Sequence, residues 1–243
     1  WNVILVDYFS PEMGNAPSVE GIAKRLSVAL KQALPQDSTP VVWLAYSMGG
    51  IVTRQLLLND EALQRRTKLG FFVSCPFLGS DLAELGAVLK QQPQLEGMYA
   101  PEPGRQDSVF AVKQTEDWKR QVLPNSKSGC YQGAFEKVAT KGVFVVRELS
   151  AKAGLNGPCR EIWKDHLSIC RPDDETSDVH QYFRDAFESA VLSDLQREEA
   201  TRQGTTTRAS IDDVLAELKR VRVQLAHSEA PSRNVEPVGG VGL

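Results

Sequence analysis

Short continuous apolar runs alternate along the chain with stretches in which apolar residues recur every three or four positions. Continuous runs bounded by turn-forming residues predict strands buried on both faces, whereas the three-to-four spacing predicts helices with one buried side. The runs predict strands at 3–8, 40–45, 69–74 and 142–146, with a weaker one at 129–135. The stripes predict helices at 51–58, 81–90, 109–122 and 179–195, and one between Ser18, which can cap it, and Pro35, which ends it.

The links between these strands are long enough to hold crossover helices, which indicates a mainly parallel sheet with helices on both faces. The predicted fold class is therefore α/β. The chain opens at Trp1 and runs directly into the apolar stretch Val3–Val6. Because a natural protein rarely begins inside a strand, we expect N-terminal strands of the sheet to be missing from it.

Domain organisation follows from where the apolar pattern stops. With 243 residues, 42% of them hydrophobic, the chain can bury one sizeable core, which we assign to residues 1–196. Residues 197–243 read as a polar linker, an amphipathic helix at 211–225 and a Pro/Gly-rich disordered tail. That helix either folds back on the first domain or binds a protein partner.

The charge and cysteine content of the chain argue against a nucleic-acid partner and against a metal site. The 28 basic and 31 acidic residues leave no cationic excess for a phosphate backbone, so no nucleic-acid partner is expected. The four cysteines show neither a CxxC pair nor the spacing of a zinc site, so we expect no metal and a reducing, cytoplasmic location. No run of about 18 apolar residues predicts a membrane span.

The chemistry-bearing motif is Ala45-Tyr46-Ser47-Met48-Gly49-Gly50, between a predicted strand and the helix 51–58. A nucleophile elbow places a serine at such a turn, where its hydroxyl stands clear of the sheet. The turn needs small residues two before and two after the serine, and Ala45 and Gly49 occupy those places. The alternative is a glycine-rich turn with a solvated serine, which the flanking strand and helix disfavour.

A serine nucleophile needs a base, and three histidines are available. His227 lies in the tail, and His180 lies within a predicted helix. His166 lies in a loop between the last predicted strand and the last helix of the domain, where the chain order Ser, acid, His places the base. The predicted pair is therefore Ser47 and His166.

At this point the sequence resembles lipase-like serine esterases related to GPI inositol-deacylases and to the serine-active-site lipase-like proteins. Four blocks over residues 1–190 carry the resemblance: Val6-Asp7-Tyr8, Ala45–Gly50, Ser74-Cys75-Pro76-Phe77-Leu78-Gly79-Ser80, and Asp165-His166-Leu167-Ser168-Ile169-Cys170. It implies an α/β-hydrolase fold, no cofactor, and His166 as catalytic base. Two positions depart from the family pattern, Ala45 in place of Gly and Cys75 in place of Thr.

The acid that orients the histidine should sit at the end of a strand before the histidine loop. Glu148 follows the predicted strand 142–146 and precedes Ser150-Ala151, where the resembling proteins often carry an acid. We therefore expect Glu148 in this role and keep Asp165 and Glu136 as alternatives. Met48 can supply one backbone N–H to an oxyanion hole, and the second donor is expected from a loop preceding Trp1.

Three functions compete on these residues. The favoured one is hydrolysis of a carboxylic ester through an acyl-enzyme, with a small-molecule or lipid ester as substrate and peripheral contact with a membrane for the latter. The second is a catalytically weak or inactive hydrolase-fold input module of a multidomain signalling protein. A thiol enzyme using Cys75 comes third, because Cys75 follows an apolar strand and is expected to be a small core residue.

Overall fold

The computed structural model describes residues 3–6, 18–34, 39–79 and 109–192 of the chain. The chain divides into two compact units, of which the larger is Tyr8–Gly204 and the smaller joins Trp1–Asp7 to Thr205–Leu243. All described residues except 3–6 belong to the larger unit. The predicted helices at 81–90 and 211–225, and the linker and tail of 197–243, lie outside the described residues.

The larger unit is built from alternating helices and strands. In chain order they are α1 (Val19–Ala33), β1 (Val41–Tyr46), α2 (Met48–Asn59), α3 (Glu61–Arg66), β2 (Thr67–Val73), α5 (Val109–Gln121), the 3-10 turn η2 (Leu123–Asn125), β3 (Tyr131–Glu136), α6 (Glu148–Lys152), β4 (Cys159–Ile162), α7 (Asp178–Phe187) and the π-helical turn η3 (Glu188–Leu192).

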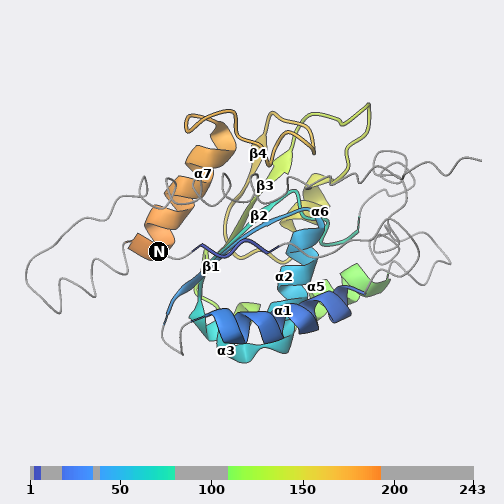
Figure 1. Ribbon diagram of the computed structural model, residues 1–243. Helices are drawn as coiled ribbons and strands as arrows, with labels where there is room; N and C mark the ends of the chain where they lie inside the picture. The colour runs from blue at the N-terminus through green and yellow to red at the C-terminus, as the bar shows by residue number, and fades with distance from the viewer. Residues whose placement is uncertain (1–2, 7–17, 35–38, 80–108, 193–243) are drawn as a thin grey trace, which may run out of the picture. The chain divides into compact units, whose positions relative to one another are not determined.

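The four described strands form one parallel sheet in the order β1-β2-β3-β4 (Figure 1). Each strand therefore pairs with the next along the chain, and a helix-bearing link brings the chain back to the start of each new strand. The predicted α/β class and parallel sheet are confirmed. In such a sheet the carboxyl ends of all strands meet at one edge, where segments distant in sequence come together.

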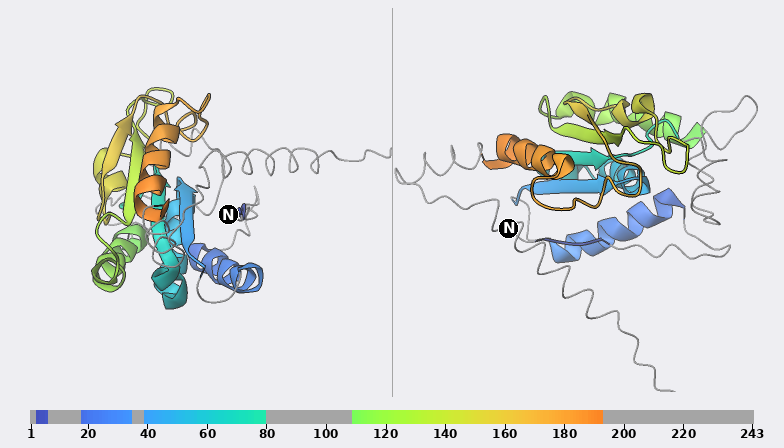
Figure 2. Two further views of the ribbon diagram at one scale, coloured as in Figure 1. Left: turned by 90° about the vertical axis from the view of Figure 1, so that its left-hand side faces the viewer. Right: turned by 90° about the horizontal axis from the view of Figure 1, so that it is seen from above.

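Neighbouring residues of β2 show how both faces are covered. Phe71 makes edge-on ring contacts with Tyr182 and Phe183 of α7, at centroid distances of 5.1 and 5.3 Å. Phe72 points the other way and meets the rings of Phe77 and Tyr131. Figures 1 and 2 show α7 on one face of the sheet and α1, α2 and α5 on the other.

The four longer helices correspond to predicted stripes, whereas the short helices α3 and α6 were not predicted. In α1, the Ser18 hydroxyl accepts a hydrogen bond from the Gly21 N–H at 3.1 Å, which satisfies one N–H of the first turn as the sequence predicts. The predicted helices 109–122 and 179–195 correspond to α5 and α7, although the helix from Asp178 passes into a π-helical turn at Glu188.

Two predicted strands are absent from the described residues. Of the predicted strand at 3–8, the described residues Val3–Val6 have no regular secondary structure, and Leu5 is 63% exposed. Residues 142–146 are a loop: Thr140 and Val143 close a tight turn through Lys141 and Gly142, both at positive φ. The apolar character of this loop reflects burial of Val145 and Val146 and not sheet pairing.

Candidate active site

Ser47 occupies a sharp turn between the last residue of β1 and the first residue of α2. Its backbone is at φ 50° and ψ −126°, a conformation that costs a non-glycine residue free energy and is typical of functional turns. The Ser47 N–H donates to the Val73 carbonyl of β2 at 3.0 Å, which ties the strained turn to the sheet.

A close packing contact explains the glycine at position 50. A Cβ at Gly50 would lie 2.3 Å from the Sγ and 2.7 Å from the Cβ of Cys75. The first turn of α2 therefore rests directly on the segment that follows β2. Cys75 is fully buried, and this burial raises the pKa of its thiol far above the ordinary value. The geometry thus makes Cys75 a core residue and removes support for a thiol enzyme.

Three side chains form one chain of hydrogen bonds at the carboxyl edge of the sheet. The Oγ of Ser47 lies 3.1 Å from Nε2 of His166, and Nδ1 of His166 lies 2.9 Å from Oε2 of Glu136. Because an ionised carboxylate only accepts, the proton of the second bond belongs to Nδ1, and Nε2 is left to accept from the Ser47 hydroxyl. His166 and Glu136 are each 2% exposed, so water competes little with these bonds.

Glu136 is the last residue of β3 and uses both carboxylate oxygens. Oε2 faces His166, and Oε1 accepts the Val146 N–H at 2.7 Å. The loop that the apolar pattern marked as a strand thus serves to orient this carboxylate. A buried glutamate ending a strand is the signal that identifies the position, and the sequence kept it only as an alternative.

The carboxylate that contacts His166 is that of Glu136 and not that of Glu148, the expected acid. The side chain of Glu148 is half exposed in the first turn of α6, where it forms an ion pair with Lys152. The hydrogen bond and charge of Lys152 lower the pKa of Glu148. The physical reason is that residues 142–146 are a loop, so Glu148 does not sit at the end of a strand.

The other candidates have separate roles or positions. Asp165 accepts hydrogen bonds from the N–H and hydroxyl of Ser168, both at 2.8 Å, which closes the turn after β4 and lowers the pKa of Asp165. His180 belongs to α7 and lies outside the Ser47–His166–Glu136 chain, and His227 lies outside the described residues.

Met48 begins α2, so its backbone N–H has no acceptor within the helix. This N–H directly follows Ser47 and is available to an oxygen atom near the Ser47 hydroxyl. The second donor was expected from a segment before Trp1, and the described residues do not test that expectation.

Arg54 is a buried residue that the sequence analysis missed. Its guanidinium is fully buried, with Cζ 3.1 Å from the centre of the Phe77 ring and Nη2 donating to the Ala153 carbonyl at 2.6 Å. Burial lowers the pKa of Arg54. Arg54 thereby links α2 to the loop after β2 and to the segment after α6, and the apolar stripe at 51–58 gave no signal for it.

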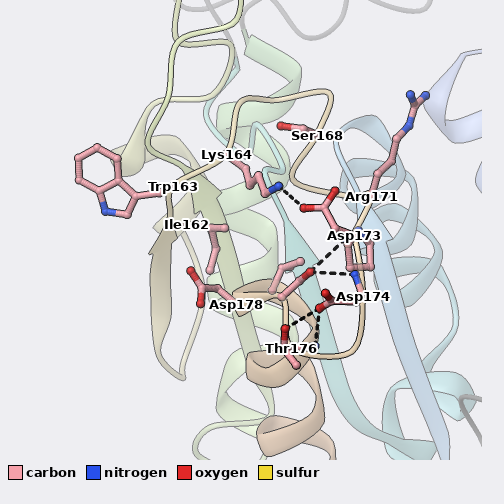
Figure 3. A pocket seen from close by; sticks show the side chains of 12 residues that line it. Ile162, Trp163, Lys164, Ser168, Arg171, Asp173, Asp174, Thr176 and Asp178 are labelled. Atoms are coloured by element: carbon pink, nitrogen blue, oxygen red, sulfur yellow. Dashed lines mark hydrogen bonds and ion pairs between the residues drawn. The ribbon is translucent and has the colours of Figure 1, made fainter.

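A pocket of about 270 Å³ lies against the loop between β4 and α7. Figure 3 shows Lys164, Asp173, Asp174 and Thr176 around it, with the Trp163 ring directed away. Ser47, Glu136 and His166 do not line it, so this pocket is distinct from the chain of hydrogen bonds described above.

Among the residues that the structure describes, no group of three His, Cys, Asp or Glu side chains could hold a metal ion. The four cysteines are free thiols. Within the same residues, none of the helices combines the length and the apolar character needed to cross a bilayer.

Comparisons with known proteins point to one fold. No family model matches the chain. Protein SERAC1 of Danio rerio is 26% identical over 163 residues, which cover 60% of this chain and 24% of that protein, so the chain spans about a quarter of this relative.

Among solved structures, phospholipase PlaB of Legionella pneumophila superposes with a TM-score of 0.51 at 12% identity, covering 79% of this chain and 55% of that one. Bacillus licheniformis lipase BlEst2 gives a TM-score of 0.48 at 16% identity, covering 62% and 68%. The superposition on PlaB, together with the parallel sheet and its helices, therefore shows that the chain has the α/β-hydrolase fold.

Proposed function

We propose that this protein is a serine hydrolase that cleaves carboxylic esters, with Ser47 as nucleophile, His166 as general base and Glu136 as the orienting acid. The observation that carries the proposal is the continuous hydrogen-bonded chain from Ser47 Oγ through both ring nitrogens of His166 to Glu136. Its three members come from separate segments and meet at a strained strand-to-helix turn, which is the arrangement of a nucleophile elbow with its triad.

The geometry supports a two-step acyl transfer. Ser47 Oγ bonds to the ester carbonyl carbon while Nε2 of His166 takes the hydroxyl proton, and the developing oxyanion faces the Met48 N–H. When the C–O bond to the alcohol breaks, His166 returns the proton to the leaving oxygen. Water then attacks the acyl carbon and loses a proton to His166, and as the bond from that carbon to Ser47 Oγ breaks, His166 returns the proton to Oγ and the carboxylic acid leaves. Glu136 stabilises the imidazolium in both steps.

A lipid ester is the substrate class that the surroundings of the site favour. Five large apolar side chains remain exposed on the segments that follow β3 and β4, at the edge of the sheet that holds Ser47: Val138, Phe144, Leu149, Trp163 and Leu167. Leu149 is 75% and Trp163 69% exposed. Exposed apolar side chains suit contact with acyl chains or a membrane surface, which is the peripheral contact that we propose for these segments.

The test is labelling with a fluorophosphonate, which reacts only with an activated serine. We expect one adduct per chain, mapped to Ser47 by peptide mass, and none in Ser47→Ala. His166→Ala should abolish labelling, whereas the matched variant His180→Ala should label like the wild type, since His180 lies outside the chain of hydrogen bonds. A folded wild-type protein that forms no adduct would refute the hydrolase.

The same experiment decides the alternative of an inactive input module. Such a module could keep the fold without an activated serine, and it would stay unlabelled. The intact geometry of Ser47, His166 and Glu136 favours the hydrolase, because a chain without turnover has no need to bury Glu136 against a histidine.

A further inference from the structure

The backbone of His166 is held on both sides by side chains. The Tyr46 hydroxyl donates to the His166 carbonyl at 2.7 Å, and the His166 N–H donates to Oγ1 of Thr140 at 2.9 Å. Tyr46 ends β1 and directly precedes Ser47, whereas Thr140 lies in the segment after β3 that begins beside Glu136. The two anchors of His166 thus lie close in sequence to Ser47 and to Glu136.

The phenol of Tyr46 is suited to this bond. Its ring lies with the centroid 5.1 Å from that of the His166 imidazole. Burial, together with the neighbouring Cys170 thiol, raises the pKa of Tyr46, which favours the protonated phenol that donates this bond. The bond spans 120 positions of sequence and joins the serine turn to the histidine loop.

Such anchoring matters because the side-chain bonds of His166 orient its ring but do not fix its Cα. A general base must stay within hydrogen-bond reach of the proton that it takes, and a displacement of about 1 Å can cost on the order of 100-fold in rate. His166 lies in a loop, whose backbone no strand fixes. Tyr46 ties the loop to β1, so movement of one member of the Ser47–His166 pair carries the other with it.

We propose that Tyr46, together with Thr140, is a positioning residue that holds the His166 main chain at the distance from Ser47 required for proton transfer. This inference rests on the proposed hydrolase function. It adds a requirement on position 46, directly before the nucleophile, where the side chain must donate a hydrogen bond from a hydroxyl as well as fill space.

The first test compares two tyrosines that make the same kind of bond. Tyr46→Phe keeps the ring and removes the donor to His166. Tyr182→Phe is the matched control, because the Tyr182 hydroxyl donates to the Pro158 carbonyl at 2.8 Å, on α7 and away from His166. With a 4-nitrophenyl ester we expect Tyr46→Phe to lower kcat by about 10- to 100-fold with KM within about twofold, and Tyr182→Phe to leave both unchanged.

The second test addresses Thr140. Thr140→Val removes the acceptor of the His166 N–H and should lower kcat, whereas Thr140→Ser keeps a hydroxyl oxygen and should restore it. Because Thr140 is buried, Thr140→Val can also weaken the fold, and the serine variant separates a lost anchor from a packing defect. Equal loss in both Thr140 variants would overturn its positioning role.

A spectroscopic signature distinguishes this proposal from the proposed function. The proton shared by Nδ1 of His166 and Glu136 should give the most downfield proton resonance in the NMR spectrum, absent in His166→Ala. We expect that resonance to broaden or move in Tyr46→Phe and to stay fixed in Tyr182→Phe, at unchanged thermal unfolding midpoints. Identical spectra and kcat for the two variants would overturn the proposal. A wild-type protein that forms no fluorophosphonate adduct would refute the proposed hydrolase. It would not by itself refute the positioning role of Tyr46, because the resonance reports on the surroundings of His166 without turnover.

Discussion

Glu136 and Glu148 flank one loop, yet their surroundings give them opposite properties. Glu136 is 2% exposed, and each of its oxygens has a partner, His166 and the Val146 N–H. Glu148 is exposed to solvent and pairs with Lys152 on the same helix. The interaction of a buried carboxylate with a neighbouring imidazole is little weakened by water, whereas the charge of a solvated carboxylate is screened. Of these two carboxylates, only Glu136 contacts His166, so we propose Glu136 and not Glu148 as the acid.

This contrast yields a prediction with a built-in control. Glu136→Gln keeps the shape of the side chain but removes the charge, and its amide N–H can impose the wrong tautomer on His166. We expect kcat on a 4-nitrophenyl ester to fall by about 10⁴-fold, as for the equivalent change in other triads. Glu148→Gln should retain wild-type kcat. A large loss in Glu148→Gln with little in Glu136→Gln would return the role to Glu148.

The residue types and their order were predictable, but the partner of His166 was not. The strand–serine–helix pattern around Ser47 and the loop around His166 are local signals, and the structure brings these two side chains within 3.1 Å; their catalytic roles stay predictions. The rule that the acid ends a strand also holds for Glu136. We applied this rule to residues 142–146, which are a loop. Their run of apolar residues reflects burial of Val145 and Val146, and a short buried loop has the same apolar pattern as a short buried strand.

At the scale of elements, Asp60 joins two helices that cover the same face of the sheet. It caps α3 by accepting the Leu63 N–H at 3.1 Å. Its other oxygen accepts the Ser27 hydroxyl of α1 at 3.1 Å and lies 3.4 Å from Lys31 Nζ. Burial alone would raise the pKa of Asp60, but these hydrogen bonds and the Lys31 charge outweigh burial and lower it.

Asp60 should therefore contribute stability that depends on pH. Because its pKa is lower in the folded state, this contribution is complete above the unfolded pKa of about 4 and is lost as the pH falls through the folded value. We expect Asp60→Ala to lower the free energy of unfolding by about 1 kcal/mol at pH 7, measured by urea denaturation. The difference from the wild type should shrink below about pH 4. A difference that stays constant to pH 3 would contradict this account, and Asp60→Asn, which keeps the cap without the charge, isolates the charge effect.

Helices were easier to predict than strands for a physical reason. The apolar stripes of α1, α2, α5 and α7 repeat over about three or four helical turns, so one irregular position does not hide the pattern. A strand offers only a few residues. The strand β4 (Cys159–Ile162) was missed because Arg160 and Glu161 are exposed, as expected for the last strand of the described sheet. Without a continuous apolar run it gives almost no local signal.

At the scale of the whole unit, the sheet order sets what the site can be. Ser47 follows β1, Glu136 ends β3 and His166 follows β4, so the site exists only where the carboxyl ends of three strands meet. The α/β class, the parallel sheet and the cover on both faces could be predicted from alternation alone. The strand order and the lateral register could not, because they depend on pairings between residues far apart in sequence.

That separation has a consequence for the order of events in folding. Ser47 and His166 are 119 positions apart, and His166 and Glu136 are 30 apart, so the loops that their contacts close are long. The entropic cost of closing a loop rises with its length, and contacts between distant residues form slowly, so we expect these contacts to form late. On dilution from urea, we expect the fluorescence of the buried Trp118, measured with the other three tryptophans replaced by phenylalanine, to recover before fluorophosphonate reactivity at Ser47. Simultaneous recovery would mean that β4 pairs with the sheet at the same time as the core forms. A lag would mean that fluorophosphonate reactivity reports only on the fully paired sheet and does not detect a compact intermediate.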